Sequence, residues 1–451
     1  MIKKPSPYRY FDNRFETIDE NGLLALQTRR LKSVVSYVTR NSLFYKQLFK
    51  KYKIKPSMIR NLQDIEKLPF TNLEDVRKFN WKFVTKEKAS QIFCSGGTTG
   101  KPKIFFCSSN DLRFMFERSA RSFVACGVME SDVVAVLQPF GIWALGYDYI
   151  QALNMVGATV LPLGINLEDI DSAKLMKTLK VTVVLVAPGN FCRLTGFIKK
   201  HGFSLKKDFQ IRIIITAGEK LTVQQRKFLE NSWNADVFDL YGTSETGTLG
   251  GECIEKNGLH LWGDHFLFEV VDPKEENKIA NGNEPGELVI TTLTQHGTPL
   301  IRYRTRDIVK KTSKQCRCGR THSLFEILGR IDESVALKEG TKVFSYQVEN
   351  VLRHLSECTG NYRVVIEDHR GRDKLTFLIE VRKNKKNLFL KNKLSRLIGT
   401  LSIDFVDAVN SGIVLKPIIK LLSSLSVKST KRGKLIKFID KRRNIIKCEG
   451  I

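Results

Sequence analysis

The stretch Ser95-Gly96-Gly97-Thr98-Thr99-Gly100-Lys101-Pro102-Lys103 lies between two short strand-like runs, Gln91–Cys94 and Ile104–Cys107. Its glycines let backbone N–H groups converge on an anion, because no Cβ stands in the way. Its hydroxyl side chains add donors, and its lysines add charge suited to a polyphosphate. It is not a Walker A loop, since Pro102 follows the Gly-Lys pair where that motif needs Ser or Thr. We therefore predict a phosphate-binding loop, and the alternative for the loop alone is a flexible hairpin turn.

Taken whole, this stretch resembles the phosphate loop of the adenylate-forming superfamily, which contains acyl-CoA synthetases, adenylation domains and luciferases. Those enzymes join a carboxylate to the AMP part of ATP and release pyrophosphate. The resemblance implies a loop that holds the ATP phosphates. Its expected contact residues are Ser95, Gly96, Gly97, Thr98, Thr99, Gly100 and Lys103.

Continuous β-branched runs predict the fold of the larger part of the chain. Val133–Leu137 is apolar throughout, and Val181–Val186 and Ile211–Ile215 are apolar except at Thr182 and Arg212. Helical segments separate the three runs. Such runs are typical of buried strands in a largely parallel α/β sheet. Before them, the spacing of apolar residues predicts one amphipathic helix over Leu23–Tyr45.

Two motifs lie where the carboxyl ends of these strands would form a ligand crevice. Thr216-Ala217-Gly218-Glu219 follows the Ile211 strand and resembles a family segment near the adenine, which implicates Gly218 and Glu219. The second motif is Asp239-Leu240-Tyr241-Gly242-Thr243-Ser244-Glu245-Thr246-Gly247. A ring can stack near a purine, a glycine permits close approach, and a carboxylate can hold Mg²⁺. We expect Tyr241, Gly242, Thr243 and Ser244 at the nucleotide and Glu245 at the magnesium.

Three later motifs complete the resemblance. Tyr303-Arg304-Thr305-Arg306-Asp307 offers Asp307 to the ribose hydroxyls, and its Arg306 stands where the widespread form of the family has glycine. In Leu328-Gly329-Arg330-Ile331-Asp332-Glu333 the resemblance implies that Arg330 reaches the nucleotide and that Asp332 is the hinge between domains. In Lys431-Arg432-Gly433-Lys434, it implies that Lys434 meets the acyl carboxylate and α-phosphate in the transition state. A surface lysine in a basic tail is the alternative for Lys434.

These motifs imply a division of the chain. We expect a large N-terminal ATP- and acyl-binding α/β domain with mainly parallel sheets over residues 1–330. A small, mobile α+β C-terminal lid domain is expected over residues 331–451.

Several segments resemble the branch that contains phenylacetate–CoA ligase and its capsule-biosynthesis, CapK-like relatives. They are Asn41–Tyr45, Leu68–Thr71 and the arginine form of the Asp307 motif. In the family the stretch Gln138–Gly146 helps to wall the acyl pocket, so Phe140, Gly141 and Ala217 are expected at the substrate. Cys94 and Trp143 depart from the common phenylacetate pattern, which puts phenylacetate itself in doubt as the substrate.

Four further residues predict a structural metal site. If Asn257-Gly258 forms a hairpin turn, Cys253 and His260 share one face diagonally, and Cys316 and Cys318 offer two more sulfurs. Three cysteines and one histidine form a recognised closed zinc set. The site also resembles one carried by some phenylacetate–CoA ligase relatives. His265 or His322 are alternative fourth ligands, and buried free cysteines are the alternative to a metal.

Together the motifs predict a ligase that forms an acyl-adenylate from ATP, Mg²⁺ and a carboxylic acid, then passes the acyl group to a thiol, CoA in first place. A carrier-protein thiol, or an amine or hydroxyl of a capsular sugar, is the alternative acceptor. A protein of another class, binding nucleotides or polyanions without catalysis, is the rival interpretation.

Composition bounds the remaining properties. The formal charge is +27, and residues 381–451 carry 18 Lys and Arg against 4 Asp and Glu, a net +14. No nucleic-acid motif accompanies this charge, so no nucleic-acid partner is expected and a lysine-rich surface is the preferred explanation. Nine cysteines, no apolar leader and no apolar run of about 20 residues predict a cytoplasmic protein without a membrane span. The sequence is compatible with a homodimer.

Overall fold

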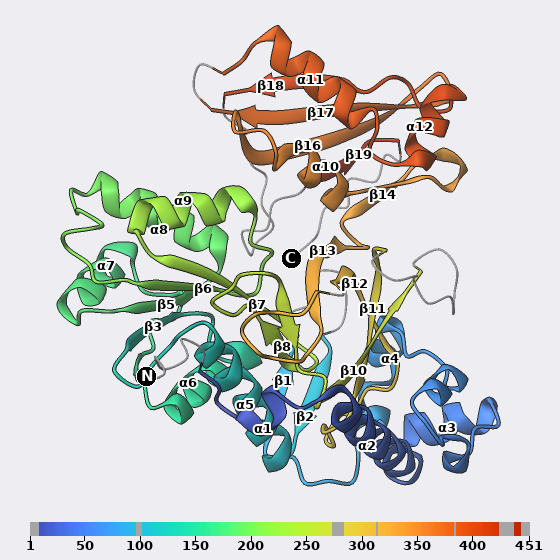
Figure 1. Ribbon diagram of the computed structural model, residues 1–451. Coiled ribbons are helices and arrows are strands. Elements are labelled where there is room, and N and C mark those ends of the chain that lie inside the picture. Colours follow the sequence, from blue (N-terminus) through green and yellow to red (C-terminus); the bar gives the residue numbers. More distant parts are fainter. Residues whose placement is uncertain are drawn as a thin grey trace, which may run out of the picture. The chain divides into compact units, whose positions relative to one another are not determined.

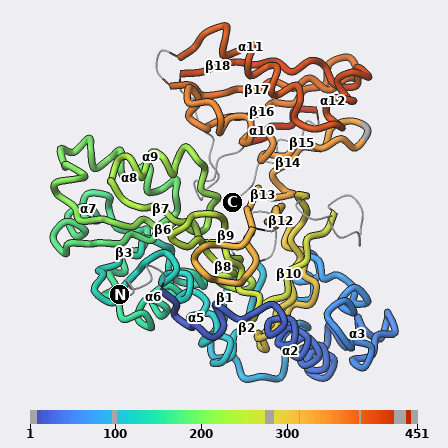
Figure 2. Tube along the Cα trace, in the orientation of Figure 1, coloured from blue at the N-terminus to red at the C-terminus, as the bar shows by residue number. Residues whose placement is uncertain are grey.

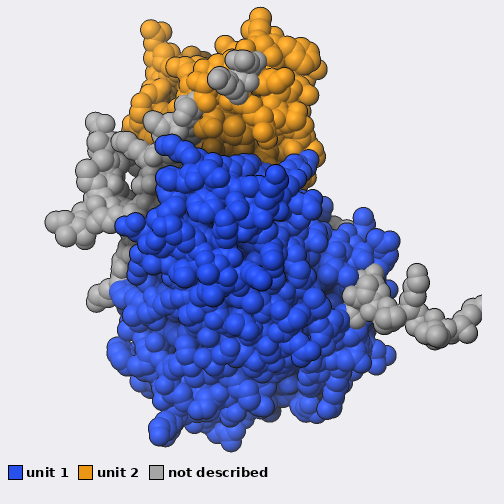
Figure 3. Space-filling model, turned by 90° about the vertical axis from the view of Figure 1, so that its left-hand side faces the viewer, with its two compact units in different colours: residues 1–221, 225–305, 309–327 blue, residues 222–224, 306–308, 328–451 orange. Residues whose placement is uncertain are grey.

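The computed structural model describes residues 9–95, 102–272, 284–312, 314–382, 385–423 and 437–442. It divides the chain into two compact units (Figure 3). Unit 1 holds residues 1–221, 225–305 and 309–327, and unit 2 holds residues 222–224, 306–308 and 328–451. The predicted boundary is a single cut after Arg330, whereas the structure also assigns two short earlier segments to unit 2.

Unit 1 begins with helices that do not follow the sequence prediction. The helices α1 (Asn13–Glu16), α2 (Glu20–Asn41), α3 (Leu43–Lys51) and α4 (Leu73–Phe83) are joined by the 3₁₀ turns η1 (Pro56–Met58) and η2 (Gln63–Lys67). The single helix predicted over 23–45 is wrong, because Ser42 is extended with φ −105° and ψ 122°. Its hydroxyl donates to the Lys82 carbonyl at 3.1 Å, and Phe44 stacks on Phe83 at 3.9 Å between ring centroids. The apolar spacing continues through this break, which is why the sequence pattern conceals it.

The centre of the fold is an eleven-stranded sheet in the order β10-β11-β12-β13-β9-β8-β7-β6-β5-β3-β4 (Figure 1). The neighbours β4, β3, β5, β6 and β7 run parallel, as the apolar runs predict, while β7, β8 and β9 pair antiparallel. The parallel strands are β3 (Val133–Leu137), β4 (Thr159–Leu161), β5 (Val183–Val186), β6 (Ile213–Thr216) and β7 (Asp236–Thr243). The others are β8 (Gly247–Gly251), β9 (Leu259–Leu261), β10 (Phe266–Val271), β11 (Gly286–Thr292), β12 (Tyr303–Thr312) and β13 (Leu324–Arg330).

Helices cover both faces of the parallel part, which explains why its strands β3 and β5 are apolar throughout. Val134 and Val136 of β3 belong to one buried cluster, whereas Ala135 and Leu137 belong to another. Successive strand residues point to opposite faces, so a strand buried on both sides must be apolar at every position. The helices around this sheet are α5 (Ser109–Ala125), α6 (Ala144–Val156), α7 (Asp169–Thr178), α8 (Pro188–Lys200) and α9 (Val223–Trp233) (Figure 2).

The predicted phosphate loop connects a separate two-stranded sheet. β1 (Gln91–Cys94) and β2 (Ile104–Cys107) pair antiparallel, with Cys94 opposite Ile104. The two strand-like runs predicted on either side of the loop are therefore confirmed. α5 follows directly, and the Ser108 hydroxyl caps it by accepting from the Asp111 N–H at 3.2 Å.

Unit 2 has its own core and its own sheets. The order β18-β17-β16-β19 joins β16 (Cys358–His369), β17 (Arg372–Val381), β18 (Ile418–Leu422) and β19 (Phe438–Asp440). A smaller sheet pairs β14 (Ser334–Ala336) with β15 (Lys342–Phe344). The helical elements are η3 (Lys338–Gly340), α10 (Ser345–Leu352), α11 (Leu388–Ile398) and α12 (Ile403–Asn410). No helix among the described residues of either unit has the length and apolarity that crossing a membrane requires.

Candidate nucleotide-binding site and metal centre

The base of the predicted phosphate loop is closed by Ser95 and Lys103. The Ser95 N–H donates to the Lys103 carbonyl at 2.9 Å, and the Lys103 N–H donates to the Ser95 Oγ at 3.2 Å. These bonds bring the two ends of the loop together. The loop residues predicted to contact phosphate, Gly96, Gly97, Thr98, Thr99 and Gly100, lie outside the described residues.

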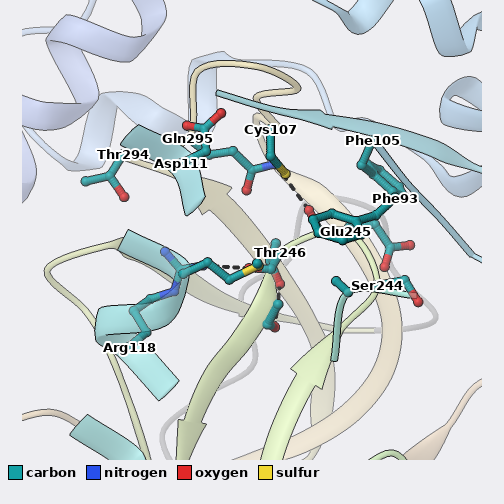
Figure 4. Close-up of a pocket in the computed structure, with 13 residues that line it drawn as sticks. Phe93, Phe105, Cys107, Asp111, Arg118, Ser244, Glu245, Thr246, Thr294 and Gln295 are labelled. Carbon is teal, nitrogen blue, oxygen red and sulfur yellow. Dashed lines mark hydrogen bonds between the residues drawn. The ribbon is translucent and has the colours of Figure 1, made fainter. Parts of the chain in front are cut away.

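Glu245 is the centre of the site in unit 1 (Figure 4). Its carboxylate forms an ion pair with Lys103 Nζ and accepts a hydrogen bond of 2.8 Å from the Tyr303 hydroxyl. Burial raises the pKa of this carboxyl, but the Lys103 charge and the hydrogen bonds from Lys103 and Tyr303 outweigh that effect and hold the pKa below its usual value. Glu245 is therefore an ionised carboxylate that is only 7% exposed, the type of oxygen ligand that Mg²⁺ prefers.

The backbone around Glu245 is also held in place. Gln295 Nε2 donates to the Glu245 carbonyl at 3.2 Å, and Arg118 Nη2 donates to the Thr246 carbonyl at 2.6 Å. Arg118 Nε donates to the Thr248 carbonyl at 3.0 Å. Arg118 and Gln295 lie in no recognised motif, so sequence reasoning missed them, and only their contacts in the fold reveal their role.

The predicted adenine segment and the tyrosine motif lie on neighbouring strands. β6 ends at Thr216 opposite Asp239 of β7, so Ala217-Gly218-Glu219 leaves β6 beside the last residues of β7, Tyr241-Gly242-Thr243. Gly218 has φ +85°, which favours glycine. At Gly242 a Cβ would lie 2.6 Å from the Gly247 carbonyl oxygen, so only glycine fits the turn that leads to Glu245. The structure thus brings the crevice residues of these two motifs to one sheet edge.

The expected acyl-pocket residues do not line the small pocket beside Glu245. Phe140 packs against the buried cluster that contains Ala217, and the carbonyl of Ile142 accepts from the Cys94 N–H at 2.8 Å. The pocket is lined by Phe93, Phe105, Cys107, Asp111, Met115, Arg118, Ala144, Ser244, Glu245, Thr246, Gly247, Thr294 and Gln295. Phe140, Gly141 and Ala217 are absent from this lining, whereas Ser244 and Glu245 belong to it.

The ribose and hinge residues form one charged network inside unit 2. Arg330 Nη1 lies 2.8 Å from Asp307 Oδ1, and Arg330 Nη2 lies 3.2 Å from Asp332 Oδ2. Arg306 Nη2 lies 2.6 Å from Asp332 Oδ1. The network places two predicted nucleotide residues beside the predicted hinge residue. Lys434 lies outside the described residues.

The predicted metal ligands converge in unit 1. Ligand atoms of Cys253, His260, Cys316 and Cys318 all lie within 4.8 Å of one another, and all four residues are buried. Cys253 Sγ and Cys316 Sγ are 3.6 Å apart, and Cys318 Sγ is 3.4 Å from His260 Nε2. Zn–S bonds of about 2.3 Å at tetrahedral angles put two sulfurs about 3.8 Å apart, so the donor set fits zinc.

The hairpin expected at this centre is wrong, and the two alternative ligands lie outside the group of four. Asn257-Gly258 is not a two-residue hairpin turn, because β8 pairs with β9 through Gly251 and His260, and the whole segment 252–258 forms the connection. His265 and His322 do not belong to the group of four. His265 Nδ1 contacts Thr294 Oγ1 at 2.9 Å, and His322 Nδ1 accepts from the Gly263 N–H at 3.2 Å.

Comparison with known proteins identifies the family. Residues 35–294 match the family described as AMP-binding enzyme, and residues 340–442 match the AMP-binding enzyme C-terminal domain. A phenylacetate-coenzyme A ligase of Thermus thermophilus is 32% identical over 378 residues, which cover 82% of this chain and 84% of that protein. The chain belongs to the AMP-binding enzyme family.

Other relatives agree with this assignment. The phenylacetate-coenzyme A ligase of Escherichia coli is 29% identical to this AMP-binding enzyme over 414 residues. The match covers 88% of the present chain and 93% of the Escherichia coli protein. Protein CapK of Staphylococcus aureus is 32% identical across 67% of each chain. The solved structure of a 2-hydroxyisobutyryl-CoA ligase in the postadenylation state superposes with a TM-score of 0.82 at 20% identity, covering 97% of this chain and 94% of the other. At that identity the likeness shows a shared fold.

Proposed function

We propose that this AMP-binding enzyme activates a carboxylic acid with ATP and transfers the resulting acyl group to a thiol, CoA in first place. The observation that carries the proposal is Glu245, a buried ionised carboxylate held between Lys103 of the phosphate hairpin and Tyr303 of the ribose motif. The match along most of the chain to ligases named for phenylacetate and CoA supports the same activity.

The first half-reaction is an attack of the acid's carboxylate oxygen on the α-phosphorus of ATP. The bond to the β-phosphate oxygen breaks, and its electron pair leaves with pyrophosphate. The Ser95–Lys103 loop would hold the β- and γ-phosphates, the crevice after β6 and β7 the adenine, and Asp307 and Arg330 the ribose. Bound Mg²⁺ would neutralise phosphate charge, with Glu245 as its protein ligand.

The second half-reaction exchanges AMP for the acceptor. A thiolate attacks the acyl carbon of the adenylate, and AMP leaves with the electron pair of the bond that breaks. A thiol needs no dedicated general base when its thiolate is accessible near neutral pH. Lys434 would stabilise the charge that develops in the adenylation step, as the resemblance implies.

The likeness to Protein CapK favours a second candidate for the acceptor. In this alternative the acyl group passes to a carrier-protein thiol, or to an amine or hydroxyl in polysaccharide biosynthesis. Adenylation is common to both candidates, so they differ only in the nucleophile that releases AMP.

We also propose that Cys253, His260, Cys316 and Cys318 hold a structural zinc ion. Their ligand atoms fit a closed tetrahedral set, which leaves no position for substrate. The centre would tie the loop between β8 and β9 to the segment between β12 and β13. None of the four residues belongs to the motifs assigned to ATP, so the zinc would support the fold and take no part in the chemistry.

The test of the main proposal is exchange of labelled pyrophosphate into ATP across a panel of carboxylic acids that includes phenylacetate, other aryl acids and short hydroxy acids. We expect exchange with at least one acid and a thioester when CoA is added. Glu245→Gln should abolish exchange, whereas Glu130→Gln, at an exposed glutamate, should not. Lys434→Ala should lower adenylation by about 10²–10³-fold, with Lys416→Ala as the matched control. If no acid in the panel supports exchange while ATP still binds, the result would favour the alternative of a nucleotide- or polyanion-binding protein without catalysis.

A further inference from the structure

Arg306 has a backbone conformation that an arginine adopts only at a cost. It lies in β12 with φ +64°, in the left-handed region. That region costs an L-residue about 1–2 kcal/mol relative to the right-handed one, and glycine avoids the cost. An arginine here therefore calls for a reason that involves its side chain.

The Arg306 side chain holds the carboxylate of Asp332. Its Nε donates to Asp332 Oδ1 at 2.7 Å, and its Nη2 lies 2.6 Å from the same oxygen. Its carbonyl accepts from the Ile331 N–H at 2.7 Å, so backbone and side chain both fix the segment around Asp332. Arg330 engages the other oxygen, Asp332 Oδ2, and also Asp307. Two arginines thus hold one carboxylate from both sides.

The ion pair between Arg306 and Asp332 does not by itself offset the cost of the Arg306 backbone. The Arg306 side chain is 35% exposed and that of Asp332 is 45% exposed. An ion pair at such a surface contributes about 0.2–1 kcal/mol, less than the left-handed backbone costs. The contacts of Arg306 with Asp332 therefore give that carboxylate a fixed orientation.

We propose that Arg306 is a positioning residue that restrains Asp332 and thereby sets the balance between adenylation and acyl transfer. The proposal rests on the proposed function, in which the family resemblance makes Asp332 the hinge. Arg330 joins Asp307 to the same carboxylate, so ribose hydroxyls bound at Asp307 would change the restraint on Asp332. A restraint that is too weak or too strong would favour one half-reaction over the other.

The first test needs no activity. Hydrogen exchange of the full chain is measured at the amides of residues 331–334 for Arg306→Met, Asp332→Asn and the double variant. Methionine keeps the unfavourable backbone but removes the ion pair. We expect each single variant to exchange about 2–5-fold faster, in keeping with the loss of an ion pair of this exposure, and the double variant to exchange no faster than the singles. Arg306→Lys should restore part of the protection.

Arg370 provides the matched control. It lies in the turn between β16 and β17 of the same unit, also with a positive φ of 54°. Arg370→Gly relieves the same kind of strain and should leave exchange at 331–334 unchanged, whereas Arg306→Gly should accelerate it. Two results would overturn the proposal. One is that the effects of Arg306→Met and Asp332→Asn on exchange at 331–334 add up in the double variant. The other is that the single variants exchange as slowly as the unmodified protein.

The second test compares the two half-reactions. With an acid that supports pyrophosphate exchange, Arg306→Met should change the ratio of exchange to thioester formation by at least about 5-fold, in parallel with Asp332→Asn. An unchanged ratio alongside active enzyme overturns the proposal. If no acid supports pyrophosphate exchange, the proposed function is contradicted instead. Amide hydrogen exchange of the single and double variants then still decides whether Arg306 restrains Asp332.

Discussion

At the scale of single residues, the site depends on one carboxylate that stays ionised in a buried place. Burying a charge is costly unless it is paired and hydrogen-bonded. Glu245 meets both conditions through Lys103 and Tyr303. In the proposed function Lys103 would turn to phosphate when ATP binds, while Tyr303 would continue to orient the carboxylate. Tyr303 is therefore the positioning residue whose effect can be isolated.

Tyr303→Phe removes one hydrogen bond to the Glu245 carboxylate without changing the shape of the side chain. A hydrogen bond to a charged group contributes about 1.5–3 kcal/mol. We expect kcat/KM for ATP in pyrophosphate exchange to fall by about 10-fold or more, with a higher requirement for Mg²⁺. Tyr37→Phe, which removes a hydroxyl that donates to Thr85 elsewhere in unit 1, is the control. If kcat/KM falls equally in Tyr303→Phe and Tyr37→Phe, the loss does not come from the hydrogen bond to Glu245 and the prediction is contradicted.

A second buried carboxyl gives unit 1 a dependence on pH. Burial raises the pKa of Asp148 to about 7, against the opposing effects of the Ser119 hydrogen bond and the Arg118 charge. Its folded pKa lies above its unfolded value, so the folded state binds the extra proton. The stabilisation from this proton is fully present below pH 4 and is lost as the pH rises through about 7.

Asp148→Asn should remove that dependence. In the unmodified protein the free energy of unfolding should fall by at most about 1.4 kcal/mol per pH unit from this group between pH 4 and 7. The asparagine variant should show a flatter profile in urea titrations over this range and a higher relative stability at pH 8. Parallel profiles for the two proteins would mean that Asp148 does not titrate in this range.

At the scale of elements, the hairpin of β8 and β9 supports both the proposed nucleotide site and the proposed metal centre. β8 begins two residues after Glu245, and β9 carries His260. The strands approach so closely that a Cβ on Gly250 would lie 1.9 Å from the His260 carbonyl oxygen. No rotation of a side chain relieves a contact between a Cβ and a backbone oxygen. Glycine at this position is therefore required for the pairing.

Gly250→Ala should separate β8 from β9 and displace His260. We expect destabilisation of more than about 3 kcal/mol, the range of severe core changes, measured as a lower midpoint of urea unfolding. Bound zinc, measured by atomic emission, should fall with it. Gly196→Ala is the matched control, because a Cβ there meets nothing within 4 Å. Retention of zinc and of stability in Gly250→Ala would contradict the tight pairing.

At the scale of the whole molecule, sequence reasoning succeeded where a local pattern has a single physical explanation. The continuous apolar runs fixed the parallel strands, because only a sheet covered on both faces needs apolar residues at every position. The four metal ligands also converge as the sequence predicted. The prediction of one helix over residues 23–45 failed at Ser42. Tertiary contacts end the helix there, although the helical spacing of apolar residues continues past it. It could not find Arg118 or Gln295, because their role comes from backbone carbonyls that only the fold brings to them.

The proposed zinc centre tests how distant parts of unit 1 depend on one another. Cys253 and Cys316 are separated by 63 positions, and their sulfurs lie 3.6 Å apart. A metal that closes so long a loop stabilises the folded state, and its binding free energy becomes folding free energy. We expect about one zinc per chain in protein purified without added metal, and a chelator should lower the melting temperature.

Cys316→Ser should reproduce the effect of the chelator. It should lose the zinc and lower the melting temperature by several degrees, since about 1 kcal/mol corresponds to about 2–4 °C in a domain of this size. Pyrophosphate exchange should persist below the new melting temperature, because none of the four ligands belongs to the ATP motifs. Cys192→Ser, at a cysteine outside the group of four, should change neither zinc content nor melting temperature. Full zinc content in Cys316→Ser, or exchange that disappears while the variant is still folded, would refute a structural zinc held by this residue.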